Sequence, residues 1–141
     1  MGPIDVVIDT NVLISALKSN RGAAHKFLIS LPNGAYKPNI SVPLFFEYES
    51  VAKRAGLVSG LTFEEVNAIL DYILSESSIR KIFYLWRPFL KDPKDDLVIE
   101  VAVESRSEYI ITFNKRDYNG IEKFGIKAVT PQEFLAEMRG I

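Results

Sequence analysis

The chain has 141 residues, 48% of them hydrophobic and 25% charged, which is enough for one soluble domain around a single core. The formal net charge of −1 excludes an overall basic surface for nucleic acid, and the lack of cysteine excludes disulfides and thiolate metal sites. No repeat or linker divides the sequence, so we expect residues 1–141 to form a single domain. Neither a signal peptide nor a membrane span is recognisable, which favours a cytoplasmic protein.

Apolar periodicity, together with proline, glycine and capping residues, predicts alternating strands and helices. The first half of the chain contains a strand over 4–8, a helix over 11–18, a helix over 23–31, a strand over 35–42 and a helix over 43–56 that ends at Gly56. The second half contains a helix from the Thr62–Glu65 capping box to about Ser77, strands over 79–86, 108–113 and 125–129, a helix within 92–105, and a last helix opened by Thr130, Pro131 and Glu133. This alternation predicts an α/β fold, a three-layer α/β/α sandwich with a central parallel sheet.

Polar residues follow two of the predicted strands. Asp9 comes directly after the first strand, and Thr112, Asn114 and Asp117 follow the apolar run of the strand over 108–113. Ligands of open parallel sheets bind outside the carboxyl ends of the strands. We therefore expect these residues, far apart in sequence, to lie along one edge of the sheet.

Glu47 lies on the apolar side of its predicted helix, because its neighbours three residues before and four residues after are Leu44 and Val51. A buried carboxylate needs a partner or a metal, which makes Glu47 a candidate site residue. Glu49 has Lys53 four residues on and is expected to form a surface ion pair.

The segment "DPKDD" places Asp92, Asp95 and Asp96 before an apolar helix. Capping and the helix dipole account for one or two of these aspartates, and Asp95 or Asp96 remains a candidate functional carboxylate. Asp117 has an alternative role as a turn residue.

Carboxylates gathered at one edge repel one another unless they bind divalent cations, and hard oxygen ligands suit Mg²⁺ or Mn²⁺. Such ions activate water for displacement at a phosphodiester. A zinc site is disfavoured because His25 is the only histidine in the sequence. The sequence also contains no Gly-rich phosphate loop of a nucleotide-binding protein and no G-x-S-x-G motif of a serine hydrolase. A phosphatase with Asp9 as nucleophile is disfavoured because such enzymes use Asp-x-Asp, and this chain has Asn11 at the second position.

Four segments together resemble the PIN-domain nucleases, and in particular the VapC-like toxins of prokaryotic toxin–antitoxin systems. They are "VVIDTNVLISAL", "ISVPLFFEYESVAKR", "DPKDDLVIEVAVESRSEYIITFNKRDY" and "VTPQEFL", in the family's order along almost the whole chain. The resemblance implies a PIN-like fold. It also implies that Asp9, Glu47 and either Asp95 or Asp96 form an acidic triad that binds metal.

The resemblance also implies that five further residues support the site around these acids, namely Thr10, Asn11, Ser41, Thr112 and Asn114. Asn114 is a departure, because many relatives have Thr-x-Asp where this chain has Thr-Phe-Asn. Asparagine keeps one oxygen acceptor but no charge, which would weaken a second metal site. Asp117, three residues on, is the candidate that compensates.

The resemblance implies a Mg²⁺- or Mn²⁺-dependent ribonuclease, endonucleolytic, that cleaves RNA with a metal-activated water. It also implies a small antitoxin as partner and pairing into a homodimer. Candidate RNA-binding cations near the motifs are Lys53, Arg54, Lys91, Lys94, Lys115 and Arg116. The alternative is a catalytically weak or inactive PIN-fold module that binds RNA or protein, and Asn114 favours it. Apolar positions of the helix after Thr62 belong either to the core or to a dimer face, and they are Phe63, Val66, Ile69, Leu70 and Ile73.

Overall fold

The structure, a computed structural model, describes residues 2–83, 89–90 and 92–139. Its centre is a five-stranded parallel sheet with the strand order β3-β2-β1-β4-β5. The strands are β1 (Ile4–Ile8), β2 (Tyr36–Ile40), β3 (Ser78–Ile79), β4 (Tyr109–Ile111) and β5 (Lys127–Val129). The predicted α/β class with a central parallel sheet is therefore confirmed.

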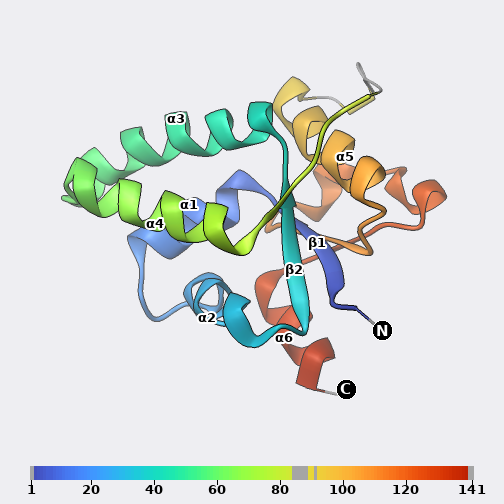
Figure 1. Cartoon of the computed structure of the whole chain (residues 1–141), viewed down its shortest axis with the longest axis horizontal. Helices are drawn as coiled ribbons and strands as arrows, with labels where there is room; N and C mark the ends of the chain where they lie inside the picture. Colours follow the sequence, from blue (N-terminus) through green and yellow to red (C-terminus); the bar gives the residue numbers. More distant parts are fainter. Residues whose placement is uncertain (1, 84–88, 91, 140–141) are drawn as a thin grey trace.

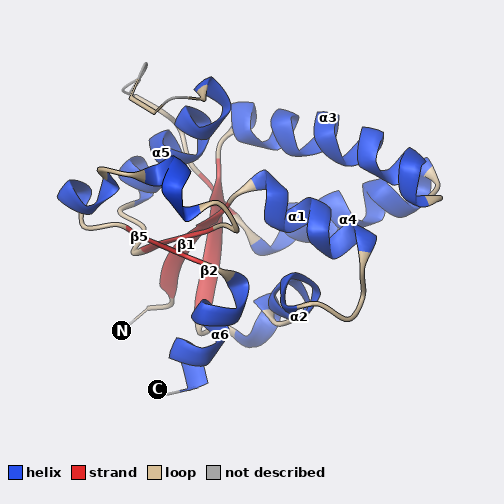
Figure 2. Cartoon of the chain, turned by 180° about the vertical axis from the view of Figure 1, so that it is seen from behind, coloured by secondary structure: helices blue, strands red, loops and turns tan. Residues whose placement is uncertain are grey.

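In the described part of the chain, six α-helices flank the sheet. They are α1 (Thr10–Lys18), α2 (Ala23–Ile29), α3 (Val42–Ser59), α4 (Phe63–Glu76), α5 (Pro93–Ser105) and α6 (Pro131–Arg139). Three short 3₁₀ helices complete the described chain: η1 (Leu31–Asn33), η2 (Lys115–Tyr118) and η3 (Ile121–Phe124). Opposite views place α5 on one side of β1 and β2, and α1, α3 and α4 on the other (Figures 1 and 2). None of the helices in these described ranges is long and apolar enough to cross a membrane.

The central strand explains the position of the core. Val6, Val7 and Ile8 of β1 are all buried, as expected for a parallel strand covered on both faces. Phe27 of α2 and Phe134 of α6 meet edge to face, with ring centroids 5.6 Å apart, beside β2. Helices on both faces therefore hold β1 in place. They thereby also fix Asp9, the residue that follows the strand.

A partly buried polar network ties the β3 edge to the centre of the sheet. The Asn39 side chain donates to Asp5 Oδ1 at 3.1 Å and accepts from Arg80 Nε at 2.7 Å. Asn39 is fully buried in β2, whereas Asp5 belongs to β1 and Arg80 follows β3. One amide thus links three neighbouring strands.

Both predicted capping boxes form. Thr62 and Glu65 exchange hydrogen bonds of 3.0 and 3.1 Å at the start of α4, and Thr130 and Glu133 do the same at 2.8 and 3.1 Å at the start of α6. These reciprocal bonds satisfy backbone N–H groups that a helix start leaves free.

Two predicted elements end more than two residues away from their predicted boundary in the described chain. Helix α3 continues through Gly56 to Ser59. Gly56 is explained by packing and not by helix termination, because a Cβ at this position would lie 2.5 Å from Val66 Cγ2 of α4. Within the described residues, the strand predicted over 79–86 is limited to β3, which ends at Ile79 beside Ile40, the last residue of its neighbour β2. Residues 80–83 have no regular structure, and 84–86 lie outside the described residues.

Candidate active site

A cleft of about 350 Å³ opens at the carboxyl ends of β1 and β4, where the chain also enters α3, α5 and η2. Its lining is dominated by carboxylate and amide side chains. The lining residues are Asp9, Thr10, Asn11, Ile14, Glu47, Val51, Asp92, Lys94, Asp95, Asn114 and Asp117. We call this the acidic cleft. It joins residues from both ends of the sequence, because the carboxyl ends of parallel strands meet at one edge.

Asp9 lies deepest in the acidic cleft and is 7% exposed. Its Oδ2 accepts a 2.8 Å hydrogen bond from the Thr112 hydroxyl and a 3.3 Å bond from Asn11 Nδ2. Asp9 occupies the N-cap position of α1, but its side chain makes no capping hydrogen bond. Burial raises the pKa of the Asp9 carboxyl, and the hydrogen bonds from Thr112 and Tyr118 act in the opposite direction. The carboxylate is therefore directed into the cleft instead of onto the helix.

Asp95, in the first turn of α5, faces the same cleft. The Tyr118 hydroxyl lies 3.4 Å from Asp95 Oδ1. Burial, followed by the negative charges of neighbouring aspartates, raises the pKa of Asp95 to about 7. Those neighbours are Asp9, Asp92 and Asp117. Burial and the repulsion by these aspartates both favour the protonated form of the Asp95 carboxyl.

Asp96 points elsewhere. It is 1% exposed, and its Oδ1 accepts a 2.9 Å hydrogen bond from the Leu90 N–H, so it fixes the chain entering α5. Asp92 is the N-cap of this helix and accepts from the Lys94 N–H at 2.9 Å. Of the two aspartates left open by sequence, Asp95 lines the acidic cleft and Asp96 does not.

Glu47 faces the acidic cleft from α3, and its side chain is 17% exposed. Lys94 Nζ lies 4.0 Å from Glu47 Oε1 and is the one lysine in the cleft lining. Glu49 pairs with Lys53 at 3.6 Å on the outside of the same helix, as the spacing predicted. The two neighbouring glutamates thus have different environments on one helix.

The supporting positions divide in a similar way. Thr10, Asn11 and Asn114 line the acidic cleft. Thr112 does not line it; this residue is fully buried and donates its hydroxyl hydrogen bond to Asp9. Ser41 is buried, and its hydroxyl accepts from the Leu44 N–H at 3.2 Å, so it caps α3.

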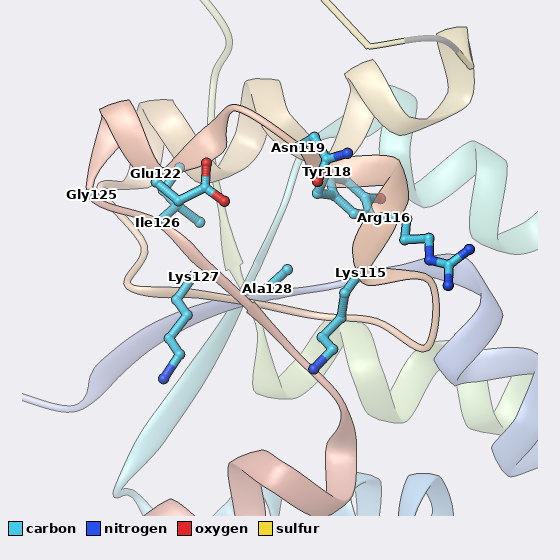
Figure 3. Close-up of a pocket in the computed structure, with 9 residues that line it drawn as sticks. All are labelled: Lys115, Arg116, Tyr118, Asn119, Glu122, Gly125, Ile126, Lys127 and Ala128. Atoms are coloured by element: carbon cyan, nitrogen blue, oxygen red, sulfur yellow. The ribbon is translucent and has the colours of Figure 1, made fainter.

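The remaining candidate cations lie outside the cleft lining. Lys53 and Arg54 are on α3 beyond Glu47, and Lys91 lies outside the described residues. Lys115 and Arg116 line a neighbouring pocket of about 460 Å³ between η2 and β5. Figure 3 shows Lys115 and Lys127 extending to one side of that pocket while Arg116 points away. Lys115 is paired with Glu133 at 3.1 Å and Lys127 with Glu137 at 3.3 Å, so both cations have carboxylate partners.

Sequence reasoning missed Tyr118 as a site residue and treated Asp92 only as a helix cap. Tyr118 is 1% exposed, and its hydroxyl donates to Asp95 Oδ1 at 3.4 Å and lies close to Asp9. Nothing in the local pattern "RDYNG" marks the tyrosine, because its partners come from distant elements. Spacing alone could not have found it.

The donors of the acidic cleft fit a hard divalent cation by their chemistry. They are oxygen atoms, most of them from carboxylates, and hard oxygen ligands suit such cations. Within the described ranges, no three Asp, Glu or His side chains approach closely enough to hold a metal ion as they stand. A cation held by three of these side chains at once would therefore require side-chain rotation around the cleft.

A parallel α/β fold with carboxylates gathered at the ends of its central strands is an arrangement found in nucleases. The sequence profile described as PIN domain matches residues 5–116, so the chain belongs to the PIN domain family, a family of nucleases. No curated protein sequence is significantly similar to the chain.

Among solved structures, the chain is similar to one described as VapBC2 from Rickettsia felis bound to a DNA fragment from their promoter. The TM-score is 0.61 at 13% sequence identity, and the match covers 90% of this chain and 98% of that chain. At this identity the similarity establishes a shared fold.

Proposed function

We propose that this protein is a divalent-metal-dependent ribonuclease that cleaves RNA endonucleolytically. The observation that carries the proposal is the acidic cleft. Asp9, which follows β1, meets there the carboxylates of Glu47 from α3, Asp95 from α5 and Asp117 from η2. When bound there, Mg²⁺ or Mn²⁺ supplies a Lewis acid that activates water and stabilises charge on a phosphodiester oxygen.

Each acidic residue has a distinct part in the proposal. Asp9 provides the deepest carboxylate, held by Thr112 and Asn11, and Glu47 and Asp95 provide carboxylates on the facing helices. Asp117 and the uncharged Asn114 lie at the η2 side, where a second cation would be held more weakly. Asp96 contributes through the backbone of Leu90 and not through a ligand atom.

RNA would enter over the cations near the acidic cleft. Lys94 is the first candidate because it lines the cleft, and Arg116 is the second because it extends outward from η2. Lys53, Arg54 and Lys115 are further candidates for phosphate contacts, although Lys53 and Lys115 would have to leave their ion pairs. Phosphate contacts of this kind weaken steeply with salt.

The biological role that we propose is that of a cytoplasmic toxin, held inactive by a small antitoxin and assembled as a homodimer. Two observations support this role: membership of the PIN domain family and similarity of fold to a VapBC2 structure. Light scattering of the purified chain, alone and with the product of a neighbouring reading frame, measures both assemblies. A chain that stays monomeric and binds no such product contradicts this role.

Cleavage of labelled RNA tests the enzymatic proposal. The wild type is expected to cleave with Mn²⁺ or Mg²⁺ and to stop in EDTA, and Asp9→Asn is expected to be inactive. Glu47→Gln and Glu49→Gln form a matched pair on one helix: the first should lose activity, and the second should keep it. Wild-type activity in Asp9→Asn would contradict a role for the acidic cleft in catalysis.

The second candidate function is a PIN-fold module that binds RNA or protein without cleaving it. Two features favour it: the uncharged Asn114 at the end of β4, and the Lys94 ammonium 4.0 Å from Glu47 in the cleft. Fluorescence anisotropy with labelled RNA separates the two functions. Binding by the wild type without cleavage in either metal supports the module.

A further inference from the structure

The Tyr118 hydroxyl lies between two carboxylates that come from different elements. Tyr118 is the last residue of η2 and is 1% exposed. Its hydroxyl donates to Asp95 Oδ1 at 3.4 Å and lies close to Asp9. A phenol keeps its proton near neutral pH, so the Tyr118 hydroxyl is the donor in this contact and the Asp95 carboxylate is the acceptor.

The two carboxylates depend on this donor to different degrees. Asp9 also accepts from Thr112 and Asn11. For Asp95, the Tyr118 hydroxyl is the one side-chain donor that the described residues supply. Without it, the Asp95 carboxylate would be free to turn away from Asp9, whose negative charge repels it.

We propose that Tyr118 is a positioning residue, whose hydroxyl holds the Asp95 carboxylate beside Asp9 so that both can share one divalent cation. This inference rests on the proposed function, because it concerns cation binding in the acidic cleft. Donors that orient metal-binding carboxylates typically contribute about 10- to 100-fold to metal affinity.

Tyr48 provides a matched control. It is also a buried tyrosine near Asp9, but its hydroxyl donates to the backbone carbonyl of Ile8. Tyr48→Phe and Tyr118→Phe each remove one buried hydroxyl, and only Tyr118→Phe removes a donor to a carboxylate. A loss of stability alone should therefore affect both variants alike.

Isothermal titration with Mn²⁺, alongside urea unfolding, tests the inference. Tyr118→Phe is expected to bind Mn²⁺ about tenfold or more weakly than the wild type. Tyr48→Phe should bind within about twofold of the wild type, at a comparable unfolding midpoint. Wild-type affinity in Tyr118→Phe, or an equal loss in Tyr48→Phe, overturns the inference.

A double-mutant cycle locates the effect. In the Asp95→Asn background, Tyr118→Phe should cause no further loss of Mn²⁺ affinity, because the carboxylate that it positions is gone. A loss as large as in the wild-type background contradicts action through Asp95.

A further measurement needs no variant that might fold poorly. In wild-type protein with ¹³Cζ-labelled tyrosine, the Tyr118 resonance should shift during a Mg²⁺ titration, and the Tyr48 resonance should shift less. An unchanged Tyr118 resonance at saturation overturns the inference, whereas a wild type that binds neither ion overturns the metal-dependent function together with it.

Discussion

The Thr112 hydroxyl donates a 2.8 Å hydrogen bond to Asp9 Oδ2, joining the end of β4 to the end of β1 across 103 residues of sequence. The same oxygen, Thr112 Oγ1, accepts from the Asn114 N–H at 3.0 Å. One buried hydroxyl therefore fixes both the deepest carboxylate of the acidic cleft and the backbone that leads to Asn114.

Thr112→Val tests this relationship, because valine keeps the shape and removes the hydroxyl. We expect the free energy of unfolding to fall by about 1–3 kcal/mol, since the buried Asp9 carboxylate loses a donor and the Asn114 N–H loses its acceptor. The pKa of Asp9 should rise further, because the lost bond lowers it. Urea unfolding and carboxyl NMR titration measure these quantities. Thr112→Ser, which keeps the hydroxyl, is the control, and equal behaviour of the two variants would contradict the role of the bond.

The raised pKa of Asp95 predicts how stability depends on pH. Its folded-state pKa, about 7, exceeds the ordinary value of 3.8, so between these values the folded state binds more protons than the unfolded state. In EDTA, the contribution of Asp95 should therefore destabilise the fold progressively as pH rises through this window. Asp95→Asn should flatten the decline in urea-unfolding free energy. A steeper decline in the variant would contradict the assignment.

Mg²⁺ should counteract this loss of folding stability as the pH rises. Cations bind deprotonated carboxylates, so stabilisation by Mg²⁺ should increase with pH across the same range. Thermal unfolding of the wild type with Mg²⁺ and with EDTA at several pH values gives the difference directly. A Mg²⁺ effect that is independent of pH would argue against binding at the acidic cleft.

Gly56→Ala should destabilise the protein although alanine favours helices. The new Cβ would lie 2.5 Å from Val66 Cγ2, a stiff and buried branch of α4. We expect a net loss of about 1–3 kcal/mol. Gly22→Ala, with open space around its Cβ, is the control. Combining Gly56→Ala with Val66→Ala should cost less than the sum of the single changes, and strict additivity would contradict the clash.

Lys94→Gln removes the lysine of the acidic cleft. Its ammonium lies 4.0 Å from Glu47 Oε1 and is mostly exposed, so the effect should be modest. We expect Mn²⁺ affinity to rise about two- to fivefold, because a competing cation is lost. Affinity for RNA should fall, measured by anisotropy at low salt. Weaker Mn²⁺ binding in this variant would show that Lys94 supports the site.

The fold was largely predictable because its signals are local. The β-branched run of β1, the capping boxes at Thr62 and Thr130, and the proline at the start of α5 each act within a few residues. The continuation of α3 past Gly56 was not predictable, because the glycine makes room for the packing of α4 and does not end the helix. The short β3 likewise depends on where its neighbour β2 ends.

The acidic cleft was predictable where strand ends determined it. Asp9 and Asn114 follow parallel neighbouring strands, and parallel topology brings such positions to one edge. The choice between Asp95 and Asp96 was left open because both occupy the first turn of α5, and the contact with Leu90 decides which one is buried. The assignment of the lining residues to catalysis stays a prediction.

The two outer strands of the sheet also bear on how copies of this chain could meet. In the described ranges, β3 has only two residues and is followed at once by Arg80, and β5 displays Lys127 with a side chain 68% exposed. Short strands and lysines at sheet edges discourage strand pairing between molecules. Two copies in a homodimer would therefore join through helix surfaces, which leaves the sheet a closed unit in each copy.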